Sequence, residues 1–259
     1  MDKMREGNGV RHQYSDSEKL VIRMKLHQKY SINKQGFGNW IYNQYAFGDN
    51  MRILELGCGD GSMWETYYAK LPSGCRLVLT DFSDGMVDDA KAKLEQYDTI
   101  EYAAVDIQSI PYEDASFDVV IANMMLYHVP NIERALAEVR RVLKRGGIFY
   151  CATFGENGIA GWLNGLLGHK GFHMSENNSF TLQNGNAVLG KFFGETELRL
   201  YEDALEVTEI SDLADYILSL DGIADTSGFT SEELSCILSL QMKDYVITIP
   251  KEYGIFLSK

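Results

Sequence analysis

An apolar stretch that runs directly into a glycine-rich turn constrains this chain more than any other feature. Residues 53–61 read Ile-Leu-Glu-Leu-Gly-Cys-Gly-Asp-Gly, and a stretch typical of a helix, Ser62 to Lys70, follows. Glycine permits positive φ and lets a ligand approach the main chain closely. The start of a helix offers free N–H groups to a polar or anionic ligand. A strand, a tight turn and a helix in this order predict a nucleotide-type cofactor site.

The spacing of the glycines narrows the kind of cofactor. A dinucleotide fingerprint with Gly57 and Gly59 requires a third glycine at position 62, which is Ser62; the third glycine comes one residue early, at Gly61. An NAD-dependent oxidoreductase is therefore disfavoured, and no Gly-Lys-Ser/Thr follows to make a P-loop. Glu55 would repel a pyrophosphate but suits a cationic ligand with an amino group. A tight turn without a ligand is the structural alternative.

Three further segments extend the pattern. The strand expected at 76–80 ends at Asp81, twenty positions after Gly61, where such folds place a carboxylate that accepts ribose hydroxyls; Asp81 as a helix N-cap is the alternative. A third strand, 100–105, ends at Asp106-Ile107. The apolar run 116–123 predicts a buried parallel strand. A helix at 131–143, a Lys-Arg-Gly-Gly turn at 144–147 and a fifth strand at 148–154 follow.

Together these segments resemble the class I S-adenosylmethionine-dependent methyltransferases, and in particular the small-molecule "type 11" group. Glu-x-Gly-x-Gly-x-Gly at 55–61 resembles motif I, Asp-Phe-Ser-x-x-Met at 81–86 the motif after the second strand, and Met-Met-Leu-Tyr-His-Val at 124–129 the fourth-strand motif. The resemblance covers roughly residues 50–154. It implies an α/β fold: a Rossmann-like seven-stranded sheet in the order 3-2-1-4-5-7-6, with the last strand antiparallel and helices on both faces.

The resemblance also implies S-adenosylmethionine as cofactor and S-adenosylhomocysteine as product. It places Gly57 and Gly59 against the amino-acid part of the donor, Glu55 near its amino group and Asp81 at the ribose. Asp106 would receive the adenine amino group. Ile107 would pack against the adenine ring. The full set of cofactor-binding residues is Glu55, Gly57, Cys58, Gly59, Gly61, Asp81, Phe82, Met86, Asp106, Ile107, Asn123 and Met124.

The segments outside this core are expected to recognise the substrate. We divide the chain into an N-terminal helical lid (1–48), the cofactor-binding core (49–154), a glycine-rich substrate cap (155–196) and a C-terminal completion of the sheet (197–259). The N-terminal helices form either a lid or plain packing against the sheet. The candidate substrate residues are Tyr14, Tyr30, Trp40 and Trp162. His169 and His173 have no acidic third ligand nearby, so no metal site is expected.

Composition bears on partners and location. The formal net charge of −13 opposes contact with nucleic acid, and small metabolites are the favoured substrates. Four scattered cysteines suggest neither a disulfide framework nor zinc. The chain shows neither an apolar run of about eighteen residues nor a signal-peptide pattern. We therefore expect a cytoplasmic enzyme, monomer or homodimer, with no membrane association.

The expected reaction is methyl transfer to a nucleophilic atom of a small metabolite. Alternatives are a protein or RNA methyltransferase and a non-catalytic protein that binds the donor. A general base is required only if the acceptor must lose a proton. The candidates are His128 and Tyr127, just past the carboxyl end of the fourth strand, where open α/β sheets bind ligands. For His128, a structural role at a helix start or in the core is the alternative. The accepting atom (O, N, S or C) stays open.

Overall fold

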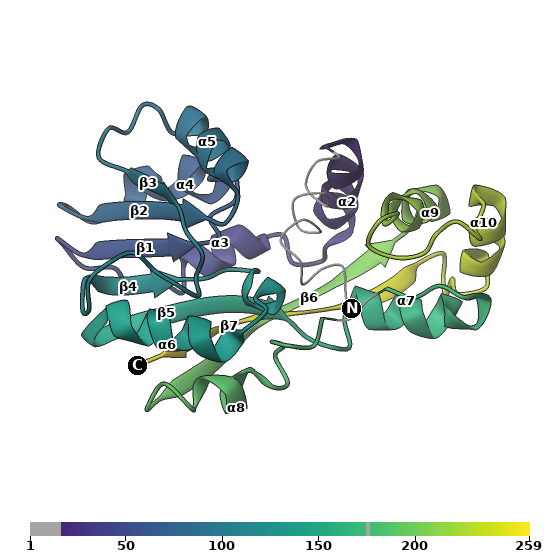
Figure 1. The fold of residues 1–259 in the computed structure, drawn as a ribbon. Coiled ribbons are helices and arrows are strands. Elements are labelled where there is room, and N and C mark those ends of the chain that lie inside the picture. Colours follow the sequence, from purple (N-terminus) through teal and green to yellow (C-terminus); the bar gives the residue numbers. More distant parts are fainter. Residues whose placement is uncertain (1–16, 175–176) are drawn as a thin grey trace. The chain divides into compact units, whose positions relative to one another are not determined.

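The computed structural model describes residues 17–174 and 177–259 (Figure 1). Its centre is a seven-stranded mixed sheet in the order β3-β2-β1-β4-β5-β7-β6, which confirms the predicted topology. The strands are β1 Arg52–Leu56, β2 Arg76–Asp81, β3 Glu101–Ala104, β4 Phe117–Ile121, β5 Leu143–Phe154, β6 Thr196–Val207 and β7 Ile247–Ser258.

The five strands β1 to β5 pair in parallel, with β1 between β2 and β4. Glu55 lies in register with Leu79 of β2 and with Ile121 of β4. Because parallel strands end at the same edge of a sheet, the turns that follow β1, β2 and β4 are neighbours there. The order of the parallel strands in the sheet therefore brings the glycine-rich turn, Asp81 and Asn123 to one edge.

Helices connect the strands and follow them in the chain. The α-helices are α2 Ser17–Tyr30, α3 Phe37–Tyr42, α4 Ser62–Tyr67, α5 Asp84–Lys93, α6 Ile132–Val142, α7 Ile159–Leu167, α8 Gly185–Leu189, α9 Ile210–Ser219 and α10 Ser231–Ser239. Short 3₁₀ turns lie at 68–70, 126–128 and 168–170. The start of α10 has a capping box, in which Thr230 and Glu233 each accept a hydrogen bond from the backbone N–H of the other.

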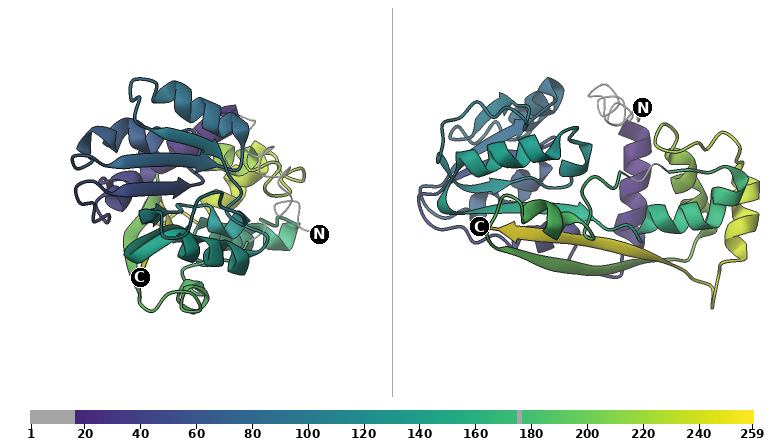
Figure 2. Two further views of the ribbon diagram at one scale, coloured as in Figure 1. Left: turned by 60° about the vertical axis from the view of Figure 1, so that its left-hand side comes forward. Right: turned by 60° about the horizontal axis from the view of Figure 1, so that its bottom comes forward.

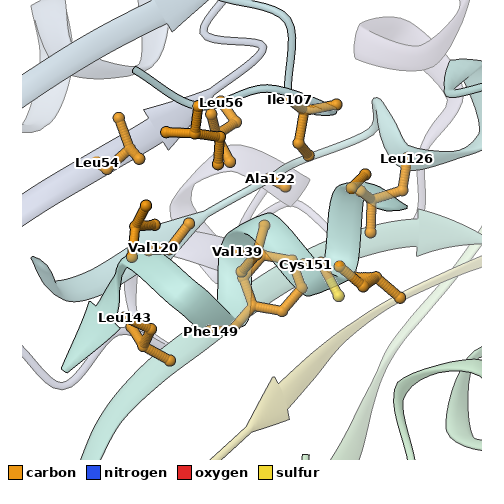
Figure 3. Close-up of a cluster of buried hydrophobic side chains, with 14 of the residues drawn as sticks. Leu54, Leu56, Ile107, Val120, Ala122, Leu126, Val139, Leu143, Phe149 and Cys151 are labelled. Carbon is orange, nitrogen blue, oxygen red and sulfur yellow. The ribbon is translucent and has the colours of Figure 1, made fainter. Parts of the chain in front are cut away.

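Alternation along the strands separates two apolar layers. Leu54 and Leu56 of β1 pack with Val139 of α6 and Phe149 of β5 in one cluster (Figure 3). Ile53, on the other face of β1, belongs to a second cluster that contains Trp64 of α4. Successive strand side chains point to opposite faces, so Glu55 shares the face of Ile53. A carboxylate is thereby placed among buried apolar groups.

The fifth strand begins earlier than the sequence predicts. We expected a turn at 144–147 and a strand from Ile148, whereas β5 starts at Leu143. Its pairing with β4 jumps from Phe117↔Leu143 to Val119↔Ile148, so the Lys-Arg-Gly-Gly stretch forms an irregularity within the strand. Gly146 has φ +80° there. The predicted turn at 144–147 is therefore wrong, because these residues belong to β5.

The chain falls into two compact units. One contains residues 17–36, 155–174, 177–178 and 201–253 of the described part, and the other contains residues 37–154, 179–200 and 254–259. Both β6 and β7 contribute residues to each unit, and Figure 2 shows these two long strands side by side. The units cut across the segments expected from sequence, because residues 155–196 are divided between them. The first unit has its own apolar core around Leu205, Leu213 and Ile217.

Candidate functional site

The turn that joins β1 to α4 has a left-handed backbone at each of its three glycines. The φ angles are +73° at Gly57, +56° at Gly59 and +72° at Gly61. A Cβ on Gly57 would lie 2.9 Å from Met125 Cγ, and one on Gly61 would lie 3.1 Å from Ala90 Cβ. A Cβ on Gly59 would meet nothing within 4 Å. Two glycines therefore allow close packing, and Gly59 leaves the main chain open to a ligand.

Asp81 holds this turn from the neighbouring strand. Its Oδ2 accepts a hydrogen bond from the Gly59 N–H (3.0 Å) and its Oδ1 one from the Ser83 N–H (2.9 Å). The N-cap of α5 is Ser83, so the alternative reading of Asp81 as the cap is wrong. A carboxylate has about four lone-pair sites, and two remain for hydroxyl groups of a ligand. The geometry is compatible with the expected ribose contact.

Glu55 lies behind the turn rather than open to solvent. Glu55 is 4% exposed, and its Oε2 accepts a hydrogen bond from Trp64 Nε1. The amide Nδ2 of Asn123 lies 3.5 Å from Oε1. Burial raises the pKa of Glu55 to about 7, the charge of Asp81 acts in the same direction, and the two hydrogen bonds oppose the shift. Both carboxylate oxygens thus have protein partners.

Asn123, at the carboxyl end of β4, links Glu55 to Tyr45. Its Nδ2 donates to the Tyr45 hydroxyl at 2.7 Å. Its Oδ1 is buried and has no hydrogen-bond partner among the described residues. The Tyr45 ring packs against the Tyr150 ring with centroids 5.0 Å apart. A buried acceptor without a donor is unusual, so this edge of the sheet is a candidate binding site.

The segment after β4 carries backbone strain and the candidate catalytic residues. Met124 has φ +53°, an uncommon conformation for a residue with a long side chain, and its N–H donates to the Ala152 carbonyl (2.9 Å). The ring of His128 lies 4.5 Å from that of Tyr127, which lies 4.5 Å from Phe154. Burial lowers the pKa of His128 to about 4, and its Nδ1 has no partner in the described part of the chain. The imidazole is therefore neutral at pH 7.

Comparison with known proteins agrees with this geometry. Residues 54–151 match the family model described as a methyltransferase domain. By this match, residues 54–151 are similar to a methyltransferase domain. The demethylmenaquinone methyltransferase of Clavibacter sepedonicus is 36% identical over 103 residues, which cover 40% of this chain and 41% of that protein. The chain thus spans less than half the length of this curated relative.

Solved structures share the fold of the methyltransferase domain and its surroundings. A candidate methyltransferase of Bacillus halodurans has a TM-score of 0.60 at 18% identity, covering 86% of this chain and 97% of its own. Phosphoethanolamine N-methyltransferase 2 of Haemonchus contortus, solved in complex with S-adenosyl-L-methionine, has a TM-score of 0.57 at 16% identity, covering 96% of this chain and 58% of its own. At these identities the likeness concerns the fold.

The remaining cofactor candidates of the methyltransferase domain lie at or near the same edge. Phe82 is exposed and Met86 is half-buried on α5. Asp106 accepts from the Gln108 N–H (2.8 Å) through Oδ1. Ile107 is 5% exposed and belongs to the apolar cluster of Figure 3, so little of its surface is available to an adenine ring. Cys58 is half-buried, and burial raises the pKa of its thiol.

The four candidate substrate residues have different surroundings. Trp40 stacks on Phe37, with centroids 6.0 Å apart, in the unit of the methyltransferase domain. Tyr30 and Trp162 belong to the other unit. Tyr30 is buried there, and its hydroxyl donates to Asp212 Oδ2 (2.7 Å), which indicates a packing role. Tyr14 lies outside the described residues.

Sequence reasoning missed two residues next to the candidate site, Tyr45 and Trp64. Both contact the polar group formed by Glu55 and Asn123. The available signal was Glu55 itself, because a carboxylate within an apolar strand needs hydrogen-bond donors. The spacing on α4 does not identify Trp64 as that donor. Among residues 17–174 and 177–259, no three His, Cys, Asp or Glu side chains are close enough to hold a metal ion.

Proposed function

We propose that the chain is an enzyme that transfers a methyl group from S-adenosylmethionine to a nucleophilic atom of a small metabolite. One observation carries this proposal: the main chain at Gly59 is open, and its N–H is held by the Asp81 carboxylate at the edge where β1, β2 and β4 end. Open α/β sheets bind ligands at this edge. The match of residues 54–151 to the methyltransferase domain supports the same cofactor.

The residues present fit the donor. The open main chain at Gly59 accommodates its amino-acid part, the lone pairs left on Asp81 suit the ribose hydroxyls, and the unpaired Asn123 Oδ1 suits a cationic amino group. Phe82, Met86, Asp106 and Ile107 would surround the adenine. The bound sulfonium supplies both the methyl group and its own leaving group. The protein then has to align the acceptor and exclude water, and alignment accounts for about 7–11 kcal/mol of barrier lowering in favourable cases.

On the acceptor side, His128 and Tyr127 are the proposed catalytic residues. The imidazole of His128 is neutral at pH 7, and its buried Nδ1 has no hydrogen-bond partner among the described residues. A base with a pKa of about 4 removes protons poorly at neutral pH. We therefore propose that His128 orients the acceptor rather than deprotonating it, and that the Tyr127 ring packs beside it. His128→Ala should lower kcat much more than the affinity for the donor.

The proposal extends to partners and location. No helix of the described residues has the length and apolar character needed to cross a membrane. All four cysteines are free, in keeping with the proposed cytoplasmic location. The net charge of −13 supports a small-molecule acceptor over nucleic acid. We propose a monomer or homodimer.

The test is transfer of a labelled methyl group. The purified chain is incubated with methyl-labelled S-adenosylmethionine and a panel of small acceptors that includes a demethylated quinone and phosphoethanolamine, the substrate types named for its relatives. Label in a small product supports the proposal. Label that enters only added protein or RNA favours the alternative methyltransferases. Donor binding without transfer to any acceptor favours a non-catalytic binding protein.

A further inference from the structure

Two buried residues, Glu55 and Trp64, and two half-buried residues, Asn123 and Tyr45, form a chain of polar side chains next to the glycine-rich turn. Trp64 of α4 donates to Glu55 of β1, and Asn123 lies between Glu55 (3.5 Å) and the Tyr45 hydroxyl (2.7 Å). Within the described residues, Glu55 forms no ion pair with a Lys, Arg or His side chain. A carboxylate is thus buried next to the proposed donor site without a positive partner, a costly arrangement in the absence of a cationic ligand.

The ionisation of Glu55 determines which way the Asn123 amide faces. An ionised carboxylate can only accept hydrogen bonds, so Asn123 must present its amide nitrogen to Glu55. The same nitrogen donates to Tyr45, which leaves Oδ1 as the unpaired atom. An unpaired buried acceptor is destabilising. A ligand that brings an N–H donor to Oδ1 would remove this cost.

This inference rests on the proposed function and deepens it. We propose that Tyr45 and Glu55 are positioning residues, which hold the Asn123 amide so that its Oδ1 accepts a hydrogen bond from the ammonium group of the bound donor, and that this binding needs Glu55 ionised. Protonated Glu55 would carry an O–H that favours the opposite amide orientation. The Asn123 nitrogen would then replace Oδ1 and meet the cationic group unfavourably.

Among the groups packed together around Glu55, Glu55 itself is the one whose protonation changes near pH 7. They are Trp64 from α4, Asn123 from β4, Tyr45 from the segment before β1, Asp81 from β2 and Cys58 from the turn. Burial raises the pKa values of Tyr45 and Cys58, so both stay neutral at pH 7. Burial raises that of Glu55 to about 7. A cation bound through Asn123 favours ionised Glu55, so binding releases a proton, and affinity falls as the pH falls below 7.

Calorimetry on the full chain tests the linkage. Affinity for S-adenosylhomocysteine is measured at pH 8 and pH 6 for the native protein and Glu55→Gln. The amine of the ligand titrates identically in both experiments, so the difference reports Glu55. Between pH 8 and pH 6, we expect the affinity of the native protein to fall about fivefold to tenfold more than that of Glu55→Gln. At pH 6.5, two buffers of different ionisation enthalpy should reveal proton release by the native protein only.

A second ligand separates positioning from folding. 5′-Methylthioadenosine has no amino-acid part, so its affinity should be unchanged in Tyr45→Phe and Glu55→Gln and independent of Glu55 ionisation. Tyr45→Phe should weaken S-adenosylhomocysteine about threefold to tenfold at pH 8, since it removes one anchor of the amide. Native binding of methylthioadenosine also shows that each variant is folded.

Three outcomes overturn the inference. Identical pH profiles for the native protein and Glu55→Gln would show that Glu55 is not linked to binding. Equal losses for the two ligands would show that Tyr45 and Glu55 support the site as a whole and do not position the amide. In both cases the proposed function survives. If the native protein bound neither ligand, the proposed function would fail and this inference with it.

Discussion

Two clusters of buried polar side chains differ in how completely their members are paired. In the unit of residues 201–253, Lys251 forms an ion pair with Asp203 and donates to Ser31 Oγ (2.7 Å). Asp203 Oδ1 also accepts from the backbone N–H groups of Asn33 (3.0 Å) and Ala204 (2.9 Å). In the other unit, the described residues supply neither a cation for the Glu55 carboxylate nor a donor for Asn123 Oδ1. The charged groups of the first cluster are paired with each other, whereas the second cluster fits a ligand that supplies the missing positive charge and N–H donor.

The largest expected effect comes from breaking the complete cluster. Lys251→Met would leave Asp203 buried and charged, and should lower the free energy of unfolding by about 3–5 kcal/mol. Denaturant unfolding measures the change. The control is Lys19→Met, which breaks the exposed pair with Asp221 and should cost at most about 1 kcal/mol. Equal effects of the two substitutions would remove the distinction between the clusters.

Acidification should lower the stability of the folded chain through His128. Its pKa in the folded chain is about 4, below the usual 6.5, so the unfolded state binds more protons between these values. Stability should therefore decline as the pH falls from 6.5 to 4, by at most about 1.4 kcal/mol per pH unit from this residue. Denaturant unfolding at several pH values should show a shallower decline in His128→Asn. An unchanged slope would mean that His128 is not buried in solution.

Asp81 gives a test of ligand binding that is separate from stability. Asp81→Ala should weaken S-adenosylhomocysteine tenfold or more, because hydrogen bonds to a charged acceptor contribute about 1.5–3 kcal/mol. Calorimetry measures the loss, and Asp84→Ala, at the exposed start of α5, is the control. Native affinity in Asp81→Ala would refute the ribose assignment and weaken the view of this edge as a binding site.

The smallest expected effect on stability is at Gly59. Gly59→Ala meets no steric obstacle but keeps an alanine at positive φ, which costs about 1–2 kcal/mol. Gly61→Ala has a similar φ and in addition contacts Ala90, so it should destabilise more. Thermal melting should show that Gly59→Ala loses less stability than Gly61→Ala. Calorimetry should show that, relative to this loss of stability, Gly59→Ala loses more donor affinity. The reverse pattern would indicate that Gly59 is only a turn residue.

Sequence patterns predict the parts of this molecule that local chemistry determines. The run from Ile53 to Gly61 predicts strand, turn and helix because apolar spacing and positive φ are local properties. Asp81 was identifiable from its distance along the chain to Gly61. The start of β5 was not, because its irregular pairing depends on β4.

Contacts between residues that are far apart in the chain could not be predicted from the sequence, for a different reason. Asp203 and Lys251 lie 48 residues apart, and Tyr45 and Asn123 lie 78 apart. The first pairing follows from the position of β6 beside β7 in the sheet, and neither pairing follows from spacing along the chain. Tyr30 was assigned to the substrate because it is aromatic and lies in the N-terminal segment. Its hydrogen bond to Asp212, 182 residues away, could not be predicted from spacing.

Calorimetric titration of the purified chain with S-adenosylmethionine, S-adenosylhomocysteine and NAD tests the central claim most directly. The open main chain at Gly59, Asp81 and the unpaired Asn123 Oδ1 predict micromolar binding of the first two ligands and none of NAD. Binding of NAD alone, or of none of the three, would contradict the assignment of the turn after β1 to a methyl donor.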